Sequence, residues 1–156
     1  MIAYVIAGVV LLILLIGAYR VFGGAASQED TSSMLPLALD EGDRLASELG
    51  ASIAAVSQDA PQRLRRRAGG LAQLVARIDV TELAGANAAA HPLVATAADD
   101  LEQASRLRTS GTFATSDGVQ QAAATLVMHA GSCLQRARKL LAASGAAEEL
   151  HGPGQP

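Results

Sequence analysis

The sequence predicts an all-α protein, with a single transmembrane helix at the N-terminus followed by an antiparallel bundle of about four helices. Three observations support this prediction. Residues 1–19 carry no charged side chain, alanine is abundant while aromatic residues make up only 3% of the chain, and later apolar residues recur at helical spacing. Alanine loses no side-chain entropy in a helix, whereas strands favour β-branched and aromatic residues in alternation.

The apolar run from Met1 to Tyr19 is long enough to cross a bilayer. A helix rises about 1.5 Å per residue, so about 20 apolar residues span a hydrocarbon core of roughly 30 Å. Tyr4 and Tyr19 lie near the two ends, where aromatic rings favour the headgroup layer, and Arg20 can extend outward. We therefore expect a transmembrane anchor over residues 1–22.

A cleaved secretory signal is the alternative interpretation of this run. Gly24 and Ala26 are small residues two positions apart, as at a signal-peptidase site. No Lys or Arg precedes Arg20, however, so a basic n-region is lacking, and the run is longer than the usual apolar core of about 7–15 residues. The positive-inside rule counts Arg20 alone, which favours a cytoplasmic bundle. The excess of Arg over Lys, with the high Ala content, indicates a GC-rich bacterial genome, so we expect the bacterial inner (plasma) membrane.

The first half of the bundle is delimited by glycine, serine and proline. Residues 23–34 are rich in Gly and Ser and predict a flexible linker. The bundle is expected over residues 35–145, and its first helix runs from about Pro36 to Ser57. A second helix starts at Pro61. The apolar residues that share the inner faces of these two helices are Leu45, Leu49, Ile53, Val56, Leu64, Leu71, Leu74, Val75 and Ile78.

The second half of the bundle is expected to hold two more helices. Pro92 marks a boundary or a kink, because proline disfavours helical geometry at the residue before it, and Gly111 closes the third helix. Phe113 is the only large apolar residue in the next loop. The fourth helix ends at Gly145, and residues 146–156 are a tail without a core pattern. The expected inner positions are Leu93, Val94, Ala97, Leu101, Leu107, Val119, Ala123, Leu126, Ala130, Cys133, Ala137 and Leu140.

A dense basic cluster lies in the first turns of the second helix, and it is formed by Arg63, Arg65, Arg66 and Arg67. One interpretation is a docking surface for anionic lipid headgroups or for an acidic partner subunit. The other is a solvated face whose arginines pair with Asp and Glu of neighbouring helices. Nucleic acid is not an expected partner, because the aromatic residues that would stack on bases are absent from this cluster.

The remaining polar residues do not predict a catalytic or metal centre. His129 and Cys133 share one helix face, but zinc sites need three or four protein ligands, so packing is the expected role of Cys133. Asp99, Asp100 and Glu102 are expected to form a solvated acidic face that complements the basic cluster. The chain contains no nucleophile elbow, phosphate-binding loop, dinucleotide fingerprint or metalloprotease motif. We therefore expect no enzyme activity, no cofactor, no metal and no small-molecule substrate.

Two functions remain after these exclusions. The first is a non-catalytic accessory or scaffold subunit of a larger membrane-protein complex, whose anchor contacts other subunits through Ala3, Ala7 and Gly8, since small residues permit close helix packing in lipid. The second is an anchored helical sensor or signalling domain. Such sensors generally place a ligand domain across the membrane, and almost nothing precedes this anchor.

In its layout the chain resembles the single-pass accessory factors of actinobacterial respiratory supercomplexes. The features that carry this resemblance are the Met1–Tyr19 anchor, the Ala- and Arg-rich helical domain and the lack of cofactor ligands. The resemblance implies that the partners are cytochrome subunits that hold haem and copper, and that this chain holds no cofactor itself.

Overall fold

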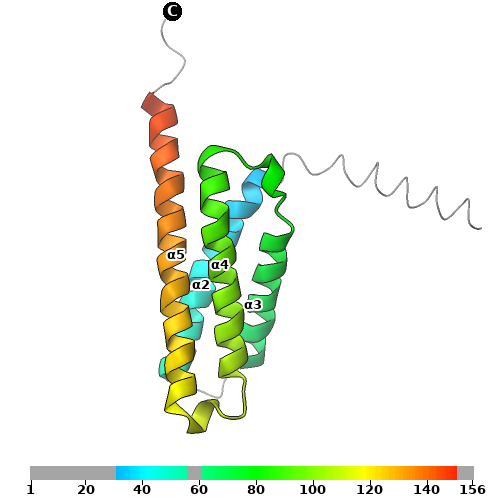
Figure 1. Ribbon diagram of the computed structural model, residues 1–156, viewed down its shortest axis with the longest axis vertical. Helices are drawn as coiled ribbons and strands as arrows, with labels where there is room; N and C mark the ends of the chain where they lie inside the picture. The colour runs from blue at the N-terminus through cyan, green and yellow to red at the C-terminus, as the bar shows by residue number, and fades with distance from the viewer. Residues whose placement is uncertain (1–30, 56–60, 151–156) are drawn as a thin grey trace, which may run out of the picture. The chain divides into compact units, whose positions relative to one another are not determined.

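The computed structural model describes residues 31–55 and 61–150, and the side chains of residues 33–55 and 61–144. The chain divides into two units, Met1–Thr31 and Ser32–Pro156, and the second is a bundle of long helices joined by short connections (Figure 1). The elements in chain order are α2 (Thr31–Ala54), α3 (Pro61–Ala76), the 3-10 turn η1 (Val80–Glu82), α4 (Gly85–Arg108), the 3-10 turn η2 (Phe113–Thr115) and α5 (Asp117–Leu150).

Consecutive long helices run in opposite directions, so each connection lies at an end of the bundle (Figure 1). The part of the chain that the structure describes contains four long helices and no strand. The predicted helical bundle is therefore confirmed. None of these helices is both long and apolar enough to cross a membrane. The predicted anchor over residues 1–22 lies outside the described residues, as does the linker up to residue 30.

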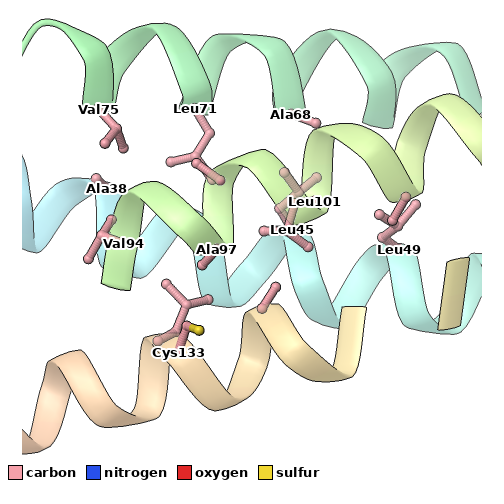
Figure 2. Packing of buried hydrophobic residues seen from close by; sticks show 14 of the residues in the cluster. Ala38, Leu45, Leu49, Ala68, Leu71, Val75, Val94, Ala97, Leu101 and Cys133 are labelled. Carbon is pink, nitrogen blue, oxygen red and sulfur yellow. The ribbon is translucent and has the colours of Figure 1, made fainter. Parts of the chain in front are cut away.

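The core is built from leucine and alanine where the four helices meet (Figure 2). Leu45 and Leu49 of α2, Leu71 of α3, and Leu101 of α4 are almost completely buried, as their spacing predicts. Alanines fill many of the other positions and let the helix axes approach closely. Nine of the 23 buried apolar residues are alanines, namely Ala38, Ala68, Ala90, Ala97, Ala98, Ala104, Ala123, Ala130 and Ala137.

The inner face of α5 differs from the predicted seam at its far end. Leu140, expected to be inside, is 40% exposed, whereas Leu134 is fully buried. A straight helix has 3.6 residues per turn, so a seam repeating every 3.5 residues rotates by about 20° per heptad and its last position turns outward. Leu134 packs against α2 at Gly42, since a Cβ added to Gly42 would lie only 3.1 Å from its Cδ2. Gly42 thus permits the close approach of α2 and α5.

Two prolines that were expected to mark helix ends lie inside helices. Pro36 is the sixth residue of α2, which begins at Thr31, so residues 31–34 of the predicted linker are helical. Pro92 lies inside α4, which begins at Gly85 in the left-handed conformation (φ 55°) that glycine adopts without steric cost. Of the two alternatives predicted for Pro92, a boundary or a kink, the boundary is therefore wrong. Buried residues on both sides of each proline hold the helix together against a local cost of about 3 kcal/mol.

Two glycines also fail to end helices where the sequence predicts it. α4 ends at Arg108, before Gly111, and its C-cap is Thr109 in right-handed helical geometry. α5 continues through Gly145 as far as Leu150, five residues into the predicted tail. A glycine inside a helix costs only about 1 kcal/mol relative to alanine, and the alanine and glutamate residues that follow Gly145 are strong helix formers.

One end of the bundle is closed by Phe113 and Arg108. Phe113 in η2 is 2% exposed, which confirms it as the apolar anchor of this loop. The Arg108 guanidinium lies 4.5 Å from the centre of its ring. Arg108 also donates from Nε to the carbonyl (3.3 Å) and hydroxyl (3.2 Å) of Ser52. A buried guanidinium with these hydrogen bonds ties the end of α4 to the end of α2.

Candidate functional site

The structure separates the four arginines of the predicted cluster into inward and outward members. Arg67 points to α2, where its Nε donates to Glu41 Oε1 at 2.8 Å and its Nη1 donates to Glu48 Oε2 at 2.6 Å. Arg63 lies 3.9 Å from the same Glu48 oxygen and its side chain is 70% exposed. The interpretation in which the arginines pair with acidic residues of a neighbouring helix is therefore correct for Arg67. Arg63 forms only a longer ion pair with Glu48.

Charge-assisted hydrogen bonds dominate this contact between α2 and α3. The hydrogen bond from Arg67 is the main reason that the pKa of Glu48 is lowered, although partial burial opposes the shift. The same bond raises the pKa of Arg67, so both groups stay ionised at neutral pH. The Arg67 side chain is only 28% exposed, so this pair is better shielded from solvent than an ordinary surface ion pair. Its role is to hold the bundle together.

Arg65 and Arg66 face outward. Both are exposed, and within the described ranges neither has an ion-pair partner. Arg77 is exposed one residue past the end of α3, and α3 itself contains no acidic residue. The outer side of α3 is therefore a basic surface, which we call the α3 basic face (Arg65, Arg66 and Arg77). The other predicted contact residues, Ala3, Ala7 and Gly8, lie outside the described residues.

A second cluster joins α4 to α5. His129 Nδ1 lies 2.6 Å from Asp100 Oδ2, and His129 Nε2 lies 3.9 Å from Cys133 Sγ. Helical spacing predicts that His129 and Cys133 share a face, but it does not predict the contact of His129 with Asp100. A carboxylate, an imidazole and a thiol in this order resemble the arrangement that activates a nucleophile.

The environment of Cys133 does not favour nucleophilic chemistry. Cys133 is 4% exposed, and burial raises the pKa of its thiol, with a smaller contribution from the Asp100 charge. A reactive cysteine needs a lowered pKa and access to solvent. Cys133 therefore packs as a small apolar residue in the core, as the sequence predicts. Among the described residues no group of three or more His, Cys, Asp and Glu side chains is placed to hold a metal ion.

The predicted acidic face on α4 is wrong, because its members have separate roles. Asp100 contacts His129 on α5, and Glu102 accepts from Arg106 one turn further along α4 at 2.6 Å. Asp99 is exposed at the edge of a cavity between α3 and α4. None of the three is an ion-pair partner of the basic cluster, whose acidic partners lie on α2.

Comparison with protein-family models, with curated proteins and with solved structures found no match. The arguments for function therefore rest on the residues of this chain and on their arrangement.

Proposed function

We propose that this protein is a non-catalytic accessory subunit, anchored in the bacterial inner membrane through residues 1–22, that docks its helical bundle on a larger membrane-protein complex. The α3 basic face is the observation that carries the proposal. Arg67 on the same helix is bound to two carboxylates, whereas Arg65 and Arg66 are exposed and have no ion-pair partner among the described residues. Exposed, unpaired charges of one sign steer and orient a partner of opposite charge.

The α3 basic face also allows a partner to come close to the helix backbone. Gly69 and Gly70 follow the arginines, and a Cβ added at either position would meet no atom within 4 Å. Small residues on a helix surface permit close contact with a second helix. The layout resemblance to accessory factors of actinobacterial respiratory supercomplexes supports cytochrome subunits as the partner, and the anchor residues Ala3, Ala7 and Gly8 as a second contact.

The first test is purification of the tagged full-length protein from native membranes in mild detergent, followed by mass spectrometry. Co-purification in a fixed ratio with cytochrome subunits is the expected result. Recovery of the protein as a monomer or homodimer would overturn the accessory role and support the sensor hypothesis. A fixed ratio with a different membrane complex would retain the accessory role and correct the partner.

Charge reversal tests the α3 basic face directly. The double substitution Arg65→Glu with Arg66→Glu should reduce recovery of the partner at least tenfold. Arg136→Glu with Lys139→Glu is the matched control, because it makes the same change in net charge at exposed positions of α5. Circular dichroism should show that both variants are folded. Equal recovery with both variants would exclude docking through this face.

A vesicle assay distinguishes lipid from protein as the occupant of this face. Sedimentation with phosphatidylglycerol vesicles should give equal binding for the Arg65→Glu, Arg66→Glu variant and for its matched control. Loss of vesicle binding in the first variant alone would assign the α3 basic face to lipid.

A further inference from the structure

A cavity of about 230 Å³, open to solvent on one side, lies between α3 and α4. Its walls are alkyl side chains such as Ala72 and Val75 of α3 and Ala95 of α4, and the polar residues that line it are His91 and Asp99. A cavity of about 150 Å³ is enough to hold a benzene ring. The space therefore fits a molecule of one ring with a short polar chain.

His91 carries an unsatisfied polar atom beside this cavity. Its Nε2 is buried and has no hydrogen-bond partner within residues 31–55 and 61–150. Leaving a buried polar atom unpaired costs free energy, so such atoms are rare in folded proteins and mark sites that need an explanation. Rotation about χ2 of histidine is broad, so the ring can turn a nitrogen toward the cavity without moving the backbone.

The backbone next to His91 carries a second local cost. Pro92 lies inside α4 and cannot donate a hydrogen bond to the carbonyl of Ala88, one turn earlier. The same turn of α4 thus holds both an interior proline and an unsatisfied imidazole.

We infer that this cavity binds a small amphipathic amine that also carries a hydroxyl group. The exposed Asp99 carboxylate would pair with the ammonium group, the alkyl walls would surround the hydrocarbon part, and the turned His91 ring would accept a hydrogen bond from the hydroxyl group. Asp99 also disfavours an anionic ligand. This site uses different residues from the α3 basic face and lies where α3 packs against α4.

The experiment uses the full-length protein in mild detergent and tyramine as the probe, with ¹H–¹⁵N NMR as the readout. Tyramine should shift the amide signals of residues that line the cavity, such as Ala72 and Ala95. Phenethylamine, which lacks the hydroxyl group, and 4-ethylphenol, which lacks the amine, should each bind about tenfold more weakly, because one hydrogen bond is lost.

Three variants assign the contacts. Asp99→Asn should weaken tyramine binding about tenfold and leave 4-ethylphenol unchanged. His91→Phe should remove the preference for tyramine over phenethylamine and raise the melting temperature, since it removes the unsatisfied nitrogen. Ala95→Leu fills the cavity and should abolish binding of all three probes, whereas the matched control Ala122→Leu, on the exposed side of α5, should bind normally.

Several results would overturn the inference. Tyramine signals that survive in the Ala95→Leu variant would place binding elsewhere, including in the detergent. A lowered melting temperature of the His91→Phe variant with unchanged probe preference would make His91 a packing residue. Lack of tyramine-induced shifts at millimolar concentration would exclude this ligand class.

Discussion

The two central helices of the bundle, α2 and α4, are joined to their neighbours by different chemistry. α2 is held to α3 by Arg67 with Glu41 and Glu48, and to α5 by Arg138, whose Nη2 lies 2.8 Å from Asp40 and 2.6 Å from Asp43.

The end of α4 is tied to α2 by Arg108 and Ser52, but two other polar features of α4 involve histidines. On the α5 side Asp100 meets His129, and on the α3 side His91 has a buried, unpaired nitrogen beside a cavity. We therefore expect α2 to be the fixed helix of the bundle. We expect α4, which lines the proposed ligand site, to be the helix whose packing responds to a ligand.

The largest expected effects should be equal on the two helices, because both share one apolar core. Leu45→Ala on α2 and Leu101→Ala on α4 each remove a side chain that is 0% exposed. Each should lower the free energy of unfolding by about 2–5 kcal/mol, measured by urea denaturation. A loss below about 1 kcal/mol for Leu101→Ala alone would mean that α4 is loosely packed. The difference between α2 and α4 would then extend from their polar contacts to the apolar core.

The arginine contact should contribute more than the histidine contact. Arg67→Ala removes two charge-assisted hydrogen bonds of a side chain that is 28% exposed, and should cost about 1–2 kcal/mol in urea denaturation. His129→Ala removes a contact made by a side chain that is 58% exposed and should cost less than about 1 kcal/mol. The reverse order of the two losses would contradict the assignment of α2 as the fixed helix.

The His91 substitution should change stability in the opposite direction. His91→Leu removes the unpaired nitrogen and keeps an apolar contact with α3, so the free energy of unfolding should rise by about 1 kcal/mol. The measurement is again urea denaturation, without added ligand. A loss of stability would show that the imidazole makes a favourable contact within the bundle.

The smallest expected effect is on the stability of the fold at acid pH. The hydrogen bond from Arg67 lowers the pKa of Glu48 in the folded protein, so the contact stabilises the fold above the unfolded pKa of about 4.3 and is lost as the pH falls through the folded pKa. Glu48→Gln should therefore flatten the decline of melting temperature below about pH 4.3. An unchanged acid profile would mean that Glu48 contributes no pH-dependent stability.

The sequence predicts the kind of fold better than the ends of its elements. Apolar spacing identified four helices and most of their inner faces. The use of Pro36, Pro92 and Gly145 as helix boundaries failed. The local cost of a proline or glycine inside a helix is about 1–3 kcal/mol. Burial on both sides outweighs this cost at the prolines, and strong helix formers outweigh it around Gly145.

The candidate sites show a similar limit. The arginine cluster is visible in the sequence, but which arginine turns inward depends on Glu41 and Glu48, which lie 26 and 19 residues before Arg67. Likewise, Asp100 and His129 meet only through the register of two antiparallel helices, 29 residues apart in the chain. The cavity has no sequence signal, because its walls are alanines and a valine that also suit an ordinary core.

The alanine-rich core has a consequence for how this protein varies. A core of leucines is usually destabilised by mutations that shorten a side chain. The nine buried alanines of this core have almost no side chain to shorten. Apart from glycine, every amino acid that a single base change can produce from an alanine codon is larger. At these positions most mutations would therefore push helices apart by overpacking, and proline would break them. Among functional variants of this bundle, we therefore expect the size of the side chain at these positions to vary less than its polarity.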